Sequence, residues 1–454
     1  MNTIPDEPAA PLDVAGGSAG GERIRWGRVA AWASWDWGSA AFNAVITTFV
    51  FAPYLANAVA TTNAPEGAPS GQVWLGISTA VTGVVIALLA PILGHRADTG
   101  GHRKRNLGIW TGLTVACMGL MFFVKDDYSY LLLGLVLLGV ANVFSEIAGV
   151  SYNAMVTQVS TPRTVGRVSG YGWGAGYVGG IFLLLILYVG VIAPETGWFG
   201  ASDVDGHRYR LVALLSAVWF ALFALPLFLA VPEKPAVEGV RVKVGIIESY
   251  RILLRDIARL WRTDRNAVYF LGASALFRDG LAAVFTFGAV LAVTVFGLPQ
   301  GDVLIFGVAA NVVAAAGAFA GGILEDRIGP KVVIMVSLVG LVVTAAVLLF
   351  VTSTAVFWVL GLALCLWVGP AQASARSFLA QVAPKGHEGQ MFGLYTTSGR
   401  AVSFLAPALV AGFSFLGGDR LGIIGIILVL VAGATALTFV RPPARRAEAD
   451  STEA

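Results

Sequence analysis

The chain has 454 residues, of which 57% are hydrophobic and only 13% are charged, and its formal net charge is +3. A soluble protein carries about twice that fraction of charged residues, so the composition excludes a soluble globular domain. The two cysteines, Cys117 and Cys365, lie in separate apolar blocks and indicate neither a disulfide framework nor a metal site.

The apolar residues fall into twelve blocks, each long enough to cross a bilayer about 30 Å thick as a helix. The sequence therefore predicts an all-α integral membrane protein with 12 transmembrane helices. The predicted spans are 29–56, 73–93, 106–124, 129–153, 166–193, 209–231, 267–296, 301–324, 331–351, 355–379, 389–416 and 420–440.

The basic residues predict the orientation of these helices. Of the 30 Lys and Arg, 23 lie in the tails or in the loops that follow even-numbered blocks. By the positive-inside rule, both termini are therefore expected in the cytoplasm, in a multi-pass protein of the cytoplasmic membrane surrounded by lipid. Residues 1–28 are expected to form a disordered tail and residues 441–454 a second cytoplasmic tail.

The first block, SWDWGSAAFNAVITTFVFAPYL, holds one acid, Asp36, about 10 Å inside the predicted helix. Three further polar residues follow it at helical spacing on one face: Ser39, Asn43 and Thr47. Such a stripe should face a water-filled cavity or other helices, because lipid would leave it without hydrogen bonds. Asp36 is either a substrate or gate residue in a cavity, or the partner of a base at the cytoplasmic end.

A loop motif, G-x-x-x-D-x-x-G followed by bases, occurs after the second block and again after the eighth. Its glycines would allow close helix contact, and its aspartates could satisfy helix N-terminal amides and pair with Arg103 or Arg327. A cluster that only sets topology is the alternative. The predicted gating residues are Gly94, Asp98, Gly101 and Arg103 in the first copy, and Gly322, Asp326, Arg327, Gly329 and Lys331 in the second.

The fifth block carries glycines at Gly172, Gly176 and Gly180. Their spacing of four places them on one helix face, where a neighbouring helix could approach closely.

A second repeat indicates a duplication. The segment QVSTPRTVGRVSG (158–170) matches QVAPKGHEGQMFG (381–393) without a gap, and Asp36 aligns with Asp279. The sequence thus predicts two pseudo-symmetric six-helix halves, 29–231 and 267–440. They are joined by a cytoplasmic linker, 232–266, that is expected to hold an amphipathic surface helix.

Charged residues inside the predicted helices form a balanced set of three acids and three bases. Pairing is expected in at least one conformation, since an unpaired buried charge costs several kcal/mol. These residues are Asp36, Glu146, Arg278, Asp279, Arg376 and Arg400, and together with Ser39, Asn43 and Asn153 they are the predicted substrate and coupling residues.

Two of these residues have specific predicted roles. Arg400, near the middle of the eleventh block, could hold an anionic substrate group through two parallel hydrogen bonds, or could form a buried ion pair with Glu146 or an aspartate. Glu146 is the first candidate for proton coupling, ahead of Asp36 and Asp279. A static pair that fixes helix packing remains the alternative for Glu146.

Two halves with this loop motif resemble the major facilitator superfamily. A narrower resemblance lies in WDWGSAAFNAVITTFVFAPYL, SYNAMVTQV, FRDG and QASARSFLAQVAPKGHEGQMFGLYTTSGRAVSF, which are similar to signatures of the fungal vacuolar amino-acid effluxers of autophagy and their bacterial relatives. The resemblance implies secondary transport of small molecules, with the loop motifs latching the cytoplasmic gate in the outward-open state. It would also place a polar residue such as Asn before Asp279, where this chain has Arg278.

The predicted function is alternating-access transport of a small zwitterionic or anionic metabolite, with amino acids as the first candidates. The predicted direction is efflux, coupled to protons, and the predicted transporting unit is a monomer. Two alternatives stay open: efflux of amphipathic drugs, which 12 Trp and 26 Phe would suit, and a non-transporting sensor or scaffold. No nucleophile–base pair, metal-ligand spacing or phosphate loop is recognisable. Neither an enzyme nor a cofactor, metal or nucleic-acid partner is therefore predicted.

Overall fold

The computed structural model describes residues 24–100, 102–233, 251, 255, 258, 261–262, 265–384 and 386–442. The predicted amphipathic helix of the linker, most of both tails and Gly101 fall outside these residues, as does the side chain of Asp98.

Within the described residues, twelve segments are long and apolar enough to cross a membrane, which confirms the predicted spans. The N-terminal half consists of α1 (Trp26–Ala40), η1 (Ala41–Phe49), α2 (Phe51–Tyr54), η2 (Leu55–Val59), α3 (Gly71–Gly100), α4 (Arg103–Leu120), α5 (Leu131–Ala154), α6 (Val156–Val159), α7 (Val165–Leu187) and α8 (His207–Ala230). The C-terminal half consists of α10 (Arg265–Thr294), α11 (Gln300–Ile328), α12 (Pro330–Leu348), α13 (Thr354–Val382), α14 (Glu388–Val402), α15 (Leu405–Gly417) and α16 (Asp419–Thr438).

The first segment is not one regular α-helix. It changes to a π-helix over η1 and breaks at Val50, whose φ is −124° and ψ is −63°. Because each π-turn takes up an extra residue, the spacing that would align Asp36 with Asn43 no longer holds. Ser39 is buried whereas Asn43 is exposed. The prediction of one continuous polar stripe was therefore wrong beyond Ser39.

The eleventh segment is also interrupted, between α14 and α15. Ser403 and Phe404 form a turn there, and the second half of the segment begins as a new helix. Its first turn is capped from another helix: the backbone N–H of Ala406 donates to Asp279 Oδ2 at 2.7 Å. A carboxylate at a helix N-terminus satisfies an amide that the helix itself leaves unpaired.

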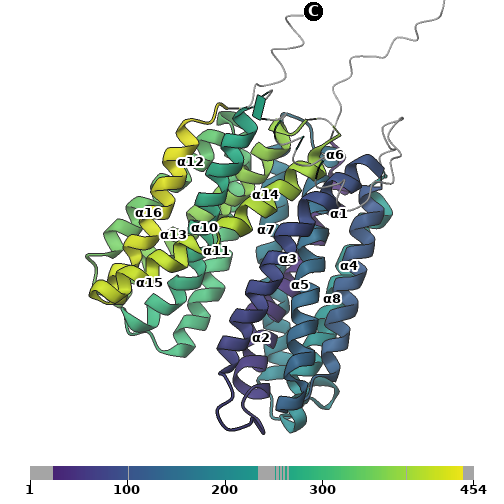
Figure 1. The fold of residues 1–454 in the computed structure, drawn as a ribbon, viewed down its shortest axis with the longest axis vertical. Coiled ribbons are helices and arrows are strands. Elements are labelled where there is room, and N and C mark those ends of the chain that lie inside the picture. Colours follow the sequence, from purple (N-terminus) through teal and green to yellow (C-terminus); the bar gives the residue numbers. More distant parts are fainter. Residues whose placement is uncertain are drawn as a thin grey trace, which may run out of the picture.

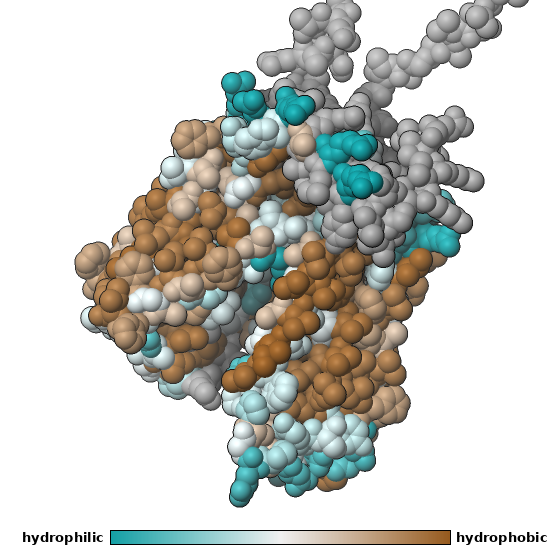
Figure 2. All heavy atoms as spheres, viewed as in Figure 1, coloured by the Kyte–Doolittle hydropathy of each residue, from teal (hydrophilic) through white to brown (hydrophobic). Residues whose placement is uncertain are grey.

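The helices form two bundles side by side, and the described chain begins and ends at the same end of the pair (Figure 1). We call this end the terminal face. Between the bundles, α7 packs against α11 and α13, and α3 packs against α14. The bundles diverge with increasing distance from the terminal face. Between the diverging bundles the surface is hollowed, with a largely apolar flank on each side (Figure 2).

Two glycine contacts hold the bundles together at the terminal face. Gly94 of α3 lies against the backbone of Gly389 in α14, and Gly322 of α11 lies against Gly166 in α7. A Cβ on Gly322 would stand 2.7 Å from the carbonyl oxygen of Gly166, so only glycine fits without a shift of the backbone. The internal repeat relates the two contacts. The close approach predicted for the motif glycines is therefore confirmed, and it closes the terminal face.

Candidate functional site

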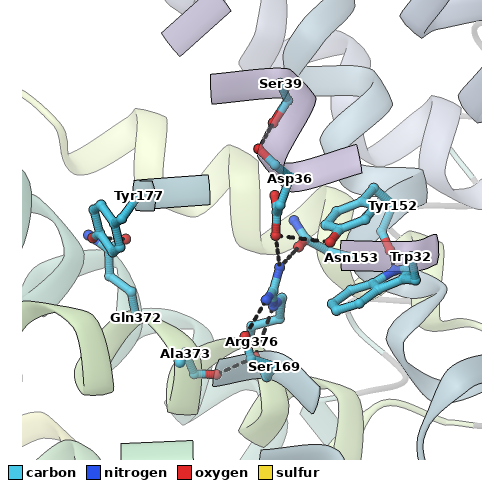
Figure 3. Close-up of polar contacts among 10 residues, drawn as sticks. All are labelled: Trp32, Asp36, Ser39, Tyr152, Asn153, Ser169, Tyr177, Gln372, Ala373 and Arg376. Atoms are coloured by element: carbon cyan, nitrogen blue, oxygen red, sulfur yellow. Dashed lines mark hydrogen bonds and ion pairs between the residues drawn. The ribbon is translucent and has the colours of Figure 1, made fainter. Parts of the chain in front are cut away.

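One guanidinium group, that of Arg376 in α13, joins the two halves. Its Nη1 lies 3.1 Å from Asp36 Oδ2 of α1 and donates to Asn153 Oδ1 of α5, also at 3.1 Å. Its Nε donates to Ser169 Oγ of α7 at 2.9 Å, and its Nη2 donates to the Ser169 carbonyl at 2.6 Å. All three partners belong to the N-terminal half, so one side chain of the C-terminal half binds three helices of the other (Figure 3).

Aromatic rings enclose this ion pair. Tyr152 donates its hydroxyl to Asp36 Oδ2 at 2.9 Å. The ring of Trp32 stacks on Tyr152 at 4.6 Å, and the Arg376 guanidinium carbon lies 4.9 Å from the Trp32 ring centroid. That distance is suitable for a cation–π contact. We call Trp32, Asp36, Tyr152, Asn153, Ser169 and Arg376 the Arg376 cluster.

The ion pair is largely buried: the side chain of Arg376 is 4% exposed and that of Asp36 is 19% exposed. Removing one member of such a pair leaves an uncompensated buried charge and costs about 3–5 kcal/mol. Asp36 pairs with a base, as one of its two interpretations expected, whereas its role as a substrate or gate residue stays a prediction. The partner, however, comes from the tenth span, 340 residues away.

The three glycines of the fifth span confirm the predicted close packing, since all three face the first span, and Gly172 and Gly176 also face Asp36 of the Arg376 cluster. A Cβ on Gly172 would stand 2.6 Å from Arg376 Nη2 and 2.9 Å from Asp36 Oδ2. Gly176 faces the backbone of Asp36, and Gly180 faces Ala40 and Ala44. Gly172 thus leaves the space that the ion pair occupies.

A second ion pair crosses between the halves. Arg400 Nη2 of α14 lies 2.5 Å from Glu146 Oε1 of α5, with side chains 26% and 35% exposed. The interpretation of Arg400 as half of a pair with Glu146 is therefore confirmed. This pair is much more open to solvent than the first, so either partner can bind water, a proton or another ion at lower cost.

Arg278 and Asp279 are neighbours in the sequence but do not pair, since successive helix residues point about 100° apart. Arg278 Nη1 donates to the Tyr395 carbonyl at 2.9 Å, and its guanidinium carbon lies 3.8 Å from the Tyr395 ring centroid. Asp279 instead caps α15 through Ala406. Of the six intramembrane charges, Arg278 and Asp279 form no ion pair in the described structure, so their pairing in another conformation stays a prediction.

Replacing Asp279 with alanine should destabilise the protein by about 1–2 kcal/mol, because the first turn of α15 loses its cap. The measurement is the thermal unfolding midpoint of the detergent-purified variant, with Glu66→Ala, at an exposed loop position, as the control. An unchanged midpoint for Asp279→Ala would show that the hydrogen bond to Ala406 does not hold the second half of this span.

Two ion pairs at the terminal face cross between the halves. Asp326 Oδ1 accepts from the Arg167 backbone N–H at 3.2 Å, in the first turn of α7, and Asp326 Oδ2 lies 3.2 Å from Arg167 Nε. Asp326 therefore satisfies a helix N-terminus as predicted, but across the halves. Arg103 likewise reaches Glu388 of the other half at 2.6 Å.

Sequence reasoning missed both partners, although each lies in or beside a matched repeat segment. The other gating residues have local positions. Gly329 turns the chain between α11 and α12 with a φ of +89°, and Lys331 Nζ donates to the carbonyls of Thr438 and Val440. Arg327 lies in the last turn of α11.

The groups gathered between the halves are suited to binding and release. They offer cations, carboxylates, hydroxyls and aromatic faces, which together can hold a small charged molecule. Among the described residues, no group of three His, Cys, Asp or Glu side chains could hold a metal ion.

Comparison with known proteins agrees with this architecture. The family described as "Vacuole effluxer Atg22 like" matches residues 157–450. YxiO of Bacillus subtilis, an MFS-type transporter, is 27% identical over 90% of this chain and 94% of its own length. Autophagy-related protein 22-1 of Penicillium rubens is 25% identical over 65% of this chain, which spans about half of that protein's length (51%).

Solved structures share the fold at low sequence identity. The proton:xylose symporter XylE superposes with a TM-score of 0.71 at 13% identity and covers 93% of this chain and 98% of its own. The transporter FucP in its outward conformation gives a TM-score of 0.66 at 16% identity, over 92% of this chain and 99% of its own.

Proposed function

We infer that this chain, which belongs to the Atg22-like vacuole effluxer family of major facilitator transporters, exports a small metabolite, with amino acids as the first candidates. The proposal places it in the cytoplasmic membrane as a monomer with both termini inside, working by alternating access and coupled to protons. With the terminal face in the cytoplasm, the described state is outward-open.

The observation that carries the substrate class is the Arg376–Asp36 ion pair. It crosses between the halves in the interior of the membrane-spanning helices. A zwitterion matches it charge for charge, because a carboxylate can take the place of Asp36 on Arg376 while an ammonium group binds Asp36. Each buried charge then keeps an opposite charge during the exchange, which avoids the cost of about 3–5 kcal/mol that an unpaired buried charge carries.

The same contacts support a mechanism. Both the Arg376–Asp36 and Arg400–Glu146 pairs join one half to the other, so they must part when the halves rock. Substrate can replace the first pair during that movement. Glu146, which is one-third exposed, can bind a proton when Arg400 withdraws, and this exchange would link transport to the pH gradient.

Efflux of amphipathic drugs is the second candidate, and the rings of Trp32, Trp35 and Tyr152 favour it. The positively charged guanidinium group of Arg376, which contacts the rings of Trp32 and Tyr152, disfavours the binding of a cationic drug. A sensor or scaffold would need no exchange of substrate at all.

The test is counterflow in proteoliposomes preloaded with a pool of unlabelled amino acids, with each labelled amino acid supplied outside in turn. Accumulation of at least one of them, abolished by Arg376→Lys, is the expected result. Counterflow of a labelled amphipathic drug alone would favour the second candidate. Protein that is folded but exchanges neither class of compound would contradict transport of both.

A further inference from the structure

Glu325 is a buried acid that the ion pairs described above do not involve. It lies in the last turns of α11, one residue before Asp326, and is 3% exposed. A Cβ on Gly166 of α7 would stand 2.6 Å from its carboxyl carbon. The carboxyl group therefore fills the seam where α7 of one half meets α11 of the other.

The hydrogen bonds of this carboxyl are incomplete. Ser377 of α13 donates its hydroxyl to Oε1. In the described part of the chain, Oε2 is buried with no hydrogen-bond partner, and so is Oγ of Ser374, whose hydroxyl faces the same carboxyl. A neutral hydroxyl such as that of Ser374 offsets only part of the cost, several kcal/mol, of burying an ionised carboxylate without a cation.

The charged groups around Glu325 do not neutralise it through an ion pair in the described structure. Arg167 of α7 binds Asp326, the acid next to Glu325 in the sequence. Arg376 of α13 is committed to the Arg376 cluster, and Lys331 of α12 binds the carbonyls at the end of α16.

A cavity of about 230 Å³ lies at the terminal face, and Glu325 is one of the residues that line it. Glu325, Asp326 and Gln381 line it from the C-terminal half, and Pro162 and Gly166 line it from the N-terminal half. Water, and with it a proton, can reach Glu325 by this route. Since both halves form the walls, the enclosed site exists only while the terminal face is closed.

We propose that Glu325 is a proton-binding residue of the seam: closing the terminal face binds one proton at Oε2 from that side, and opening it releases the proton. This inference rests on the proposed alternating-access function. Proton binding to one of two states shifts their ratio by up to about tenfold per pH unit. Acid on the terminal face therefore favours the closed seam and the outward-open state.

The experiment measures the opening of the opposite face as a function of pH. Spin labels at Ser70→Cys and Ser353→Cys, two exposed positions at the ends of helices away from the terminal face, report the distance between the halves. Cys117 and Cys365 are replaced by alanine in this background. Double electron–electron resonance is recorded in nanodiscs between pH 5 and pH 9, with and without the amino acid that exchanges best.

The wild-type background should show the long-distance population growing as the pH falls. Glu325→Gln, which carries a permanent N–H donor and no charge, should hold the long distance at every pH. Ser374→Ala, which keeps the acid but removes a hydroxyl that can donate to the ionised carboxylate, should move the transition to higher pH. Glu66→Gln, an exposed control, should behave as the wild type.

Two outcomes overturn the inference. One is a Glu325→Gln protein that keeps the wild-type pH dependence. The other is a wild type whose distances ignore pH but still shift with substrate, which would leave the proposed carrier function intact. A single distance under all conditions, together with absence of counterflow, would overturn the proposed function as well.

Discussion

Replacing Arg376 with lysine is expected to reduce counterflow by about 100-fold or more. Lysine keeps the charge but offers one compact ammonium group, which cannot bind Asp36, Asn153 and Ser169 together as the planar guanidinium does. A loss of about 3 kcal/mol in the state that binds substrate corresponds to about two orders of magnitude in rate. The measurement is the initial rate of counterflow per amount of monodisperse protein in the vesicles.

Two controls separate transport from folding. Arg420→Lys makes the same chemical change at an arginine that donates to the backbone carbonyls of Leu349 and Val351 and lies over the Phe296 ring, and it should exchange normally. The double variant Asp36→Asn/Arg376→Gln carries no charge in the cluster, so it should fold without an unpaired ion and still fail to transport. Wild-type exchange by Arg376→Lys would remove this residue from the binding site.

Arg400→Ala is expected to abolish transport while the protein remains folded. Its partner Glu146 is 35% exposed, so water can solvate the carboxylate that the substitution leaves behind. The cost to folding should therefore be small, whereas the contact between the halves in the substrate path is lost. Counterflow and the thermal unfolding midpoint, measured on the same preparation, distinguish these two effects.

Glu146→Gln is the matched variant on the other side of that pair. It should retain exchange at equal pH on both sides, since counterflow does not need a driving ion, and lose the stimulation that a pH gradient gives to net transport. Full activity of Arg400→Ala, or unchanged stimulation in Glu146→Gln, would assign the pair to helix packing alone.

The parts of the structure that could be predicted are those that local sequence determines. Hydropathy located the twelve spans, and the repeated loop motif placed Gly94 and Gly322 where helices touch, since a glycine contact is encoded in each copy. The four polar contacts of Arg376 with Asp36, Asn153 and Ser169 could not be predicted in this way. The depth of Arg400 along its helix favoured it as the substrate-binding arginine. Burial, however, depends on which face of the helix meets the other half, and the side chain of Arg376 is more buried than that of Arg400.

Departures from a regular α-helix could not be predicted from the sequence for a similar reason. The π-helix at Ala41–Phe49 and the turn at Ser403 contain no proline and no unusual composition. Each is held by tertiary contacts, such as the cap that Asp279 gives to α15. The polar stripe beyond Ser39 failed as a prediction because it assumed a regular α-helical period.

The paired glycines at the terminal face also provide a site at which a substitution could favour a different conformation. At Gly322 a single added methyl group would press on the carbonyl oxygen of Gly166, and backbone atoms cannot rotate out of the way as a side chain can. Gly322→Ala therefore penalises the closed seam and leaves an arrangement that is open at the terminal face, in which α7 and α11 separate, free of that clash. The added methyl group thus enriches a population that is open at the terminal face, which becomes a sample for determining the structure of that second conformation.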